Sequence, residues 1–175
     1  MSKIKNKMPQ TFASLIETIE NSDSFRNFKD KNPYASLCAG FFVVDYRQEG
    51  GNQQQLDYFL PDGKIFTFIL TKEITIKEAE TIQGQKIELK NLNKEIKADL
   101  DDVKNILKRE FETQGINKKI NKIIAILQNY QDKQIWNLTL MLEGFAMIQC
   151  HIDSFSGEIL KFEQKSMFDF VKKVE

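Results

Sequence analysis

Apolar side chains occur in two strand-length runs near the C-terminal end of the chain. Residues 136–142 and 145–152 are mostly apolar, and the two-residue break Glu143-Gly144 separates them. Two such runs around a short break that contains glycine are typical of a β-hairpin. The polar segment 153–157 ends in glycine, and the run 158–163 then predicts a third antiparallel strand. This part of the chain is therefore predicted to be a three-stranded meander.

The N-terminal residues 10–31 carry apolar side chains at helical spacing. One face of this predicted helix is lined by Phe12, Leu15, Ile16 and Ile19. The short amphipathic piece 24–28 either extends the helix or forms a separate turn. Pro33 then blocks continuation, because the residue before a proline is pushed towards an extended backbone.

Strands are predicted to follow this helix. Residues 34–46 are rich in aromatic and β-branched side chains and indicate a long strand, whereas residues 48–55 indicate a loop. Residues 56–60 and 65–70 flank the sequence Pro-Asp-Gly-Lys at 61–64. Proline presets φ, aspartate bonds the backbone and glycine accepts a left-handed conformation, so this segment predicts a second tight hairpin.

The segment 72–98 has a weaker pattern. Residues 72–77 and 86–90 each alternate with a period of two, and Gly84 lies between them. Two short strands are the favoured interpretation. The alternative is that the segment links the two halves of the chain.

A second helix is predicted at residues 99–113. The apolar residues in this segment fall on one face of a helix. Asp99 can cap the N-terminus of the helix, and Gly115 lies where a C-terminal cap residue is expected. Residues 120–130 also show helical spacing, but their β-branched run at 123–126 favours a strand, and a strand is the interpretation adopted.

The fold class predicted from these elements is α+β. Each half gives a helix, a long strand and a tight hairpin, so the chain reads as two similar helix-plus-antiparallel-sheet halves. This repeated order favours an internal duplication in which Gly63 corresponds to Gly144. The predicted organisation is an N-terminal unit at 1–71, a strand-containing connector at 72–98 and a C-terminal unit at 99–175.

The C-terminal unit resembles a PepSY domain, a family with a helix followed by strands that end in Ile-Asp-x-x-x-Gly-x-Ile/Val-Leu. The resemblance covers residues 99–163. It is carried by Trp136, Leu138, Leu140, Gly144, Ile152, Asp153, Gly157, Ile159 and Leu160. It implies a PepSY- or cystatin-like sheet and a non-enzymatic interaction role. Members of the family usually lie outside the cytoplasm or in propeptides, and this chain shows no signal segment.

Composition narrows the classes of partner. The 175 residues carry 25 basic and 25 acidic side chains, so the formal net charge is zero. A protein without net positive charge has no overall electrostatic attraction to nucleic acid or to an anionic membrane. No apolar window is long enough for a membrane span, and no secretory signal is evident. Cys38 and Cys150 lie in apolar runs, which fits buried free thiols in a reducing compartment, although spacing alone leaves a disulfide open. A cytoplasmic localisation is therefore expected.

Few residues suggest catalysis or metal binding. His151 is the only histidine, and Cys150 beside it should point to the opposite face of the strand, so the two should not form a nucleophile–base pair. Pairing of Cys38 with His151 across the halves has no support in the sequence. One histidine and two distant cysteines are a poor zinc set. No catalytic, cofactor-binding or metal-binding residues and no cofactor are assigned.

Two charged groups have structural interpretations. Asp99, Asp101 and Asp102 fit the positive end of a helix better than a cation site. Lys118, Lys119 and Lys122 would either guard the edge of a strand or contact phosphate, and the first reading is favoured.

The function expected from these features is that of a non-catalytic, cytoplasmic protein- or peptide-binding module. A homodimer formed through an edge strand is one expected mode, because antiparallel meanders leave outer strands unpaired. The alternative is a small-molecule binder or enzyme that uses the concave face between sheet and helix.

Overall fold

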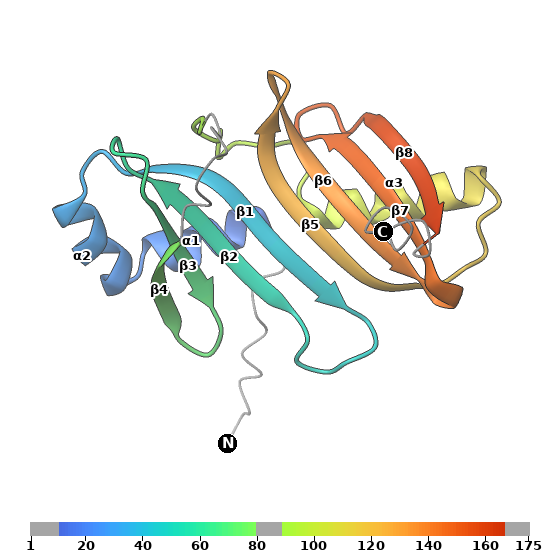
Figure 1. Cartoon of the computed structure of the whole chain (residues 1–175), viewed down its shortest axis with the longest axis horizontal. Coiled ribbons are helices and arrows are strands. Elements are labelled where there is room, and N and C mark those ends of the chain that lie inside the picture. The colour runs from blue at the N-terminus through green and yellow to red at the C-terminus, as the bar shows by residue number, and fades with distance from the viewer. Residues whose placement is uncertain (1–10, 80–88, 167–175) are drawn as a thin grey trace, which may run out of the picture.

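The computed structural model describes residues 11–79 and 89–166, which form a layer of helices on a single antiparallel sheet (Figure 1). The helices are α1 (Phe12–Glu20), α2 (Asp23–Lys31) and α3 (Leu100–Thr113). The strands of the N-terminal half are β1 (Ser36–Asp45), β2 (Gln53–Phe59), β3 (Ile65–Leu70) and β4 (Ile74–Ala79). Those of the C-terminal half are β5 (Ile120–Tyr130), β6 (Lys133–Leu142), β7 (Ala146–Asp153) and β8 (Ile159–Ser166).

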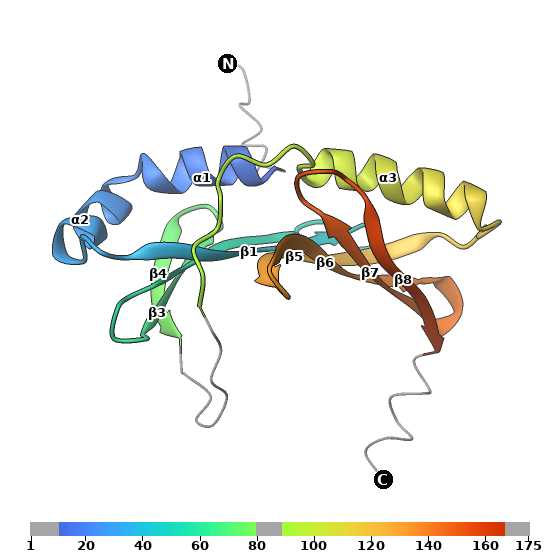
Figure 2. The same ribbon diagram turned by 90° about the horizontal axis from the view of Figure 1, so that it is seen from above.

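The eight strands are ordered β4-β3-β2-β1-β5-β6-β7-β8, and all neighbours are antiparallel. Each half contributes a four-stranded meander, and the first strands of the two meanders, β1 and β5, pair at the centre. The three helices lie on one face of the sheet, with α1 and α2 over the N-terminal meander and α3 over the C-terminal one (Figure 2). In the described residues, no helix covers the other face.

The hydrophobic core fills the space between the helices and the sheet. Phe12, Leu15 and Ile19 of α1 and Val103 and Leu107 of α3 are almost fully buried there. The sheet supplies alternate residues of each strand, including Leu56, Phe68, Leu127, Trp136, Leu138 and Leu140. The indole N–H of Trp136 donates a 2.8 Å hydrogen bond to the carbonyl of Ala98, so the largest core side chain is also satisfied as a donor.

Several local predictions are confirmed. The strand at 120–130 forms, as do the hairpins around residues 61–64 and 143–144. Gly63 and Gly144 have φ values of 87° and 75°, the left-handed region in which glycine is unstrained. Helix α3 begins after Asp99 as its N-cap, and Gly115 follows it with a φ of 66°. The α+β class is confirmed, while an internal duplication stays a prediction.

The predicted helix at 10–31 is two helices, α1 and α2. Ser22 interrupts it because its hydroxyl accepts the N–H of Phe25 at 3.2 Å and so caps a new helix, α2. The loop predicted at 48–55 is too long, since its last three residues belong to β2. Gln53, Gln54 and Gln55 join the ladder opposite the apolar residues 41–43, and pairing there overrides their weak strand propensity.

The connector and the basic run also differ from expectation. Strand β4 confirms the first short strand near 72–77, whereas most of the second, at 86–90, lies outside the described residues, and residues 89–90 are not in a strand. The lysines at 118, 119 and 122 do not guard an edge, because β5 pairs with β1 on one side and β6 on the other. The edges of the described sheet are β4 and β8.

Candidate functional site: the open face of the sheet

The face of the sheet opposite the helices, here called the open face, has an apolar centre. Successive strand residues point to opposite faces. Phe42 and Ala125 pair within the core, so their neighbours Phe41, Val43, Ile124 and Ile126 lie on the open face. These four residues, the apolar cluster, form two directly opposed pairs, Phe41 with Ile126 and Val43 with Ile124. Val43 is buried among its neighbours, and the other three are half-buried.

Polar side chains border the apolar cluster on both sides. Gln55 of β2 is opposite Phe41, while Thr139 and Asn137 of β6 are opposite Ile124 and Ile126. Beyond them, the open face continues with Gln149 and His151 of β7. An apolar centre within a polar border is the usual composition of a protein–protein interface.

One end of the apolar cluster is closed by an ion pair between the two central strands. Lys122 of β5 lies 2.9 Å from the carboxylate of Asp45 of β1, and the two residues are opposite each other in the ladder. The bond from Lys122 and the backbone N–H of Arg47 lower the pKa of Asp45 below its usual range. Asp45 is therefore ionised at neutral pH, and the pair ties β1 to β5.

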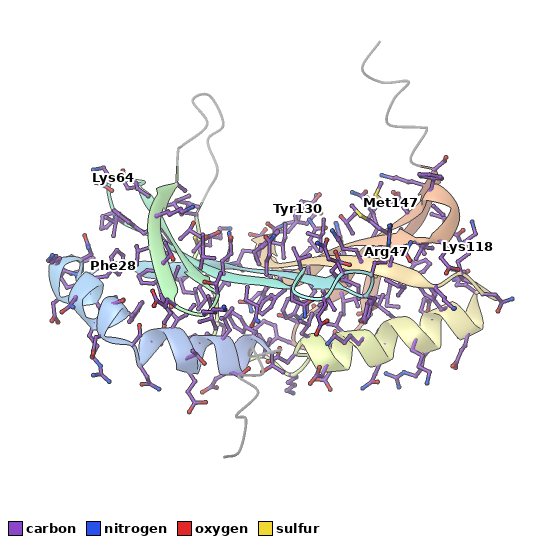
Figure 3. The ribbon with its side chains drawn as sticks, turned by 90° about the horizontal axis from the view of Figure 1, so that it is seen from below. Phe28, Arg47, Lys64, Lys118, Tyr130 and Met147 are labelled. Atoms are coloured by element: carbon purple, nitrogen blue, oxygen red, sulfur yellow. The ribbon has the colours of Figure 1, made fainter. Side chains whose placement is uncertain are left out.

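A pocket of about 450 Å³ opens on the C-terminal half of the same face. Its lining includes Tyr130, Ile135, His151, Leu160 and Lys161, from strands β5 to β8. Figure 3 shows that Tyr130 and Met147 lie on the side of the sheet away from the helices. The rings of Tyr130 and His151 meet edge to face with their centroids 5.4 Å apart. We call this site the Tyr130 pocket.

The structure separates the residues that were considered for nucleophilic chemistry. Cys150 is in the core, whereas His151 faces the Tyr130 pocket, as strand alternation predicts. Cys38 lies on β1, where its thiol donates to the carbonyl of Asp57, and β1 is separated from His151 by two strands. Both cysteines are free and buried, and burial raises each thiol pKa to about 12. These thiols are protonated at neutral pH and poor nucleophiles.

The remaining charged candidates have local roles. Asp99 and Asp102 form a capping box at the start of α3, and Asp101 lies 3.4 Å from Lys104 in an exposed ion pair. Lys118 and Lys119 are exposed in the loop before β5. Within residues 11–79 and 89–166, no group of three or more His, Cys, Asp and Glu side chains could hold a metal ion.

A smaller cavity lies on the helix side of the sheet. It measures about 190 Å³, and its lining includes Phe42, Val44, Gln54, Leu100 and Lys104. Gln54 is buried, and its amide oxygen Oε1 has no hydrogen-bond partner among the described residues. A buried amide oxygen without a partner is uncommon in proteins, so this position stands out from the apolar core around it.

Sequence reasoning missed the open face, although one signal could have found it. The runs Phe41-Phe-Val-Val and Ile123-Ile-Ala-Ile are apolar without alternation. Such runs indicate strands with apolar side chains on both faces. Sequence reasoning used these runs only to predict strands, whereas in the described structure the helices cover alternate positions of each run and leave the others on the open face. The Tyr130 pocket has no comparable local signal because four separate strands build it.

Comparison with known proteins identifies a solved structure with a similar fold but does not assign the chain to a family. No protein-family model matches the chain, so the resemblance to PepSY domains is not confirmed, and no curated protein matches it. Among solved structures, the chain is similar to the crystal structure of a protein described as a "putative lipoprotein" from Clostridium difficile 630. The TM-score is 0.52 with 16% sequence identity, over 82% of this chain and 91% of that chain.

This similarity corrects the localisation expected from the sequence. A lipoprotein is held at a membrane by its lipid, outside the cytoplasm, so the similarity contradicts the cytoplasmic localisation. Within the part of the chain that the structure describes, no helix is long and apolar enough to cross a membrane.

Proposed function

We propose that this protein binds another protein through the open face of its sheet. The observation that carries the proposal is the apolar cluster of Phe41, Val43, Ile124 and Ile126, which lies at the centre of the sheet on the face opposite the helices (Figure 2), with Phe41, Ile124 and Ile126 only half-buried. Apolar surface of this kind gains free energy when a partner removes it from water. The polar border described above would set the register and specificity of the partner.

A face is favoured over an edge as the contact surface. The edge strand β4 exposes Lys77 and Glu78, and charged side chains on an edge oppose pairing with another chain. A homodimer through β4 or β8 stays a prediction, which light scattering on the purified protein tests. The open face has four apolar side chains at its centre, and its strands already satisfy one another's backbone groups.

The proposed role is non-catalytic. Both cysteine thiols are buried and protonated, and Cys150, although it precedes His151 in the sequence, lies in the core while His151 faces the Tyr130 pocket. The resemblance to PepSY domains implies the same kind of role, as does the absence of a phosphate loop or nucleophile motif in the sequence.

Site-specific photo-crosslinking tests the proposal. A photoreactive amino acid is placed singly at Gln55 and Thr139 on the open face, and at the exposed Glu17 of α1 as a control on the helix layer. The proteins are expressed in the native host and the adducts are analysed by mass spectrometry. We expect the same partner to crosslink at positions 55 and 139 and not at 17.

The crosslink should also depend on the apolar cluster. Adding Phe41→Ser and Ile126→Ser to the Thr139 probe should abolish the adduct, whereas adding Lys118→Gln, at an exposed loop position, should leave it unchanged. Adducts that form only at position 17, or that persist in the Phe41 and Ile126 variant, would show that the open face is not the docking surface.

The small cavity beside Gln54 supports a second candidate, a small-molecule binder between sheet and helix. Apolar walls from Phe42 and Leu100 and one unpartnered amide oxygen would suit a small ligand that has a single hydrogen-bond donor. Native mass spectrometry of protein purified from the host tests this candidate. A bound small molecule that is lost in Gln54→Leu supports it, and ligand-free protein rejects it.

The repeated order of elements supports a further proposal, that the two halves arose by duplication. Each half has helix α1 or α3 on one face of a four-stranded meander, and the meanders meet at their first strands. Superposition of the halves should place strand β1 on β5 and Gly63 near Gly144.

A further inference from the structure

Gln54 is a polar side chain at a position where an apolar one would be expected. It lies on the helix side of β2, opposite Phe42 of β1 and Leu70 of β3, and both neighbours are buried. Gln54 itself is 5% exposed, and its oxygen Oε1 has no hydrogen-bond partner among the described residues. A buried polar group without a partner lowers stability, and proteins keep such groups most often where function requires them.

Gln54 forms part of the wall of the small cavity between the sheet and α3. Phe42 and Val44 of β1 and Leu100 of α3 supply apolar walls. Tyr46 also lines the cavity and is 56% exposed, so the cavity opens to solvent on the side of the loop between β1 and β2. The site therefore combines an apolar interior, one buried amide group and an entrance.

The charged residues of the lining already have partners within the chain. Lys104 lies 3.4 Å from Asp101, and Asp45 lies 2.9 Å from Lys122. A charged ligand would have to compete with these ion pairs and would lose its own hydration in an apolar interior. The cavity therefore favours a neutral ligand whose one polar group meets the amide of Gln54.

We propose that this cavity binds a neutral molecule with one aromatic ring and one hydroxyl group, with the ring against Phe42 and Leu100 and the hydroxyl at the amide of Gln54. The proposal rests on the small-molecule function given above as the second candidate, and it names the chemical class of the ligand. The volume of about 190 Å³ suits a single ring, because an apolar cavity of about 150 Å³ in another protein binds benzene.

A hydroxyl is the polar group that matches the amide best. It both donates and accepts hydrogen bonds, so it can pair with either end of a glutamine amide, and Oε1 is an end that has no partner. The last torsion of a glutamine side chain is broad, so the amide can turn Oε1 towards the ligand. Binding would then satisfy the polar group that the apolar row leaves unpaired.

The experiment is a titration of the full chain with phenol and with toluene at pH 7, where phenol is neutral. The two rings are nearly equal in size, and toluene carries a methyl group in place of the hydroxyl. Binding is followed by nuclear magnetic resonance of the methyl groups of Val44 and Leu100, which line the cavity. We expect both compounds to shift these signals, because both can place a ring against the apolar walls.

Variants test the role of the amide. Gln54→Leu should lower the ratio of phenol affinity to toluene affinity about tenfold, because it removes the hydrogen-bond partner and leaves the ring contacts. The same change at Gln55, which lies on the open face, should leave the ratio unchanged. Val44→Phe fills the cavity and should abolish binding of both compounds. Circular dichroism and thermal unfolding establish which variants are folded, and the methyl shifts of the wild-type protein locate the ligand independently of them.

Three results would overturn the proposal: an affinity ratio that Gln54→Leu leaves unchanged, binding that persists in folded Val44→Phe protein, or no shift at Val44 and Leu100 up to the solubility of phenol. Failure here is distinct from failure of the proposed functions. A ligand of another class, found by native mass spectrometry and lost in Gln54→Leu, would keep the cavity as a binding site. Crosslinks from Gln55 and Thr139 would still place a partner on the open face.

Discussion

The carboxylate of Asp99 accepts the backbone N–H of Phe12 at 2.7 Å, although the two residues are 87 positions apart. Asp99 is the N-cap of α3, where it also accepts the N–H of Leu100, and Phe12 is the first residue of α1. The second oxygen of Asp99 accepts the N–H of Ala13 at 3.1 Å. One side chain therefore caps two helices and joins the helix layers of the two halves.

Replacing this cap should destabilise the whole protein. Asp99→Ala leaves free N–H groups at the starts of both α1 and α3, and we expect a loss of about 2–3 kcal/mol in the free energy of unfolding. Urea denaturation followed by circular dichroism measures it. Asp101→Ala is the matched control, because among the described residues that exposed first-turn side chain forms an ion pair with Lys104 alone, and the change should cost no more than about 0.5 kcal/mol. Equal losses in the two variants would contradict the double-cap role.

Strand β6 offers a test of the core. Leu140 is fully buried in the core between the sheet and the helices, and its neighbour Thr139 faces the open side of the sheet. Leu140→Ala should lower the free energy of unfolding by roughly 2–5 kcal/mol, because it removes apolar contacts and leaves a cavity. Thr139→Ala should change it by less than about 1 kcal/mol. A small effect at position 140 would mean that the face assignment of β6 is wrong.

Gln54 should be a site where stability can be gained. Its amide oxygen is buried without a described partner, and Phe42 and Leu70 are its neighbours across the ladder. Gln54→Leu removes this polar group from an apolar row, and we expect stabilisation of about 1–2 kcal/mol. Gln55→Leu, on the open face, serves as the control and should alter stability by less than about 0.5 kcal/mol. Destabilisation by Gln54→Leu would instead show that the amide is satisfied in solution.

Because the thiols of Cys38 and Cys150 are buried, we expect them to react slowly with thiol reagents in the folded protein. We also expect the free energy of unfolding to fall at high pH. At pH 8 a thiol reagent should leave Cys38 and Cys150 of the native protein unmodified and label both after unfolding. Each folded-state pKa of about 12 exceeds the unfolded value, so the folded state holds the protons more tightly. Their contribution is complete below about pH 8.5 and is lost as pH rises towards 12.

Urea denaturation at a series of alkaline pH values measures the expected loss of stability at high pH. Cys38→Ala with Cys150→Ala should flatten the decline above pH 8.5. A slope should remain, because burial raises the pKa of Tyr58, with a further contribution from Glu20, and burial also raises the pKa of Tyr46. Rapid labelling of the native wild-type protein would show that the thiols are accessible and would contradict the burial seen here.

The sequence by itself determined the local elements. Pro-Asp-Gly at 61–63, Glu143-Gly144 and the apolar runs beside them specify hairpins through backbone preferences that act over a few residues. The same holds for α3, where Asp99 and the apolar stripe mark the helix. The separation of Cys150 from His151 also followed from alternation along one strand.

Only the tertiary structure decided how the halves meet and which surface is free. The pairing of β1 with β5 joins residues more than 75 positions apart, and no turn sequence specifies it. This pairing places Phe41 beside Ile126. The pairing of β2 with β1 and β3 places the buried Gln54 between Phe42 and Leu70. Local patterns could indicate neither arrangement. The Tyr130 pocket likewise needs four strands in register. Such features depend on packing between distant segments, and the period of a single strand gives its two faces without saying which one a helix will cover.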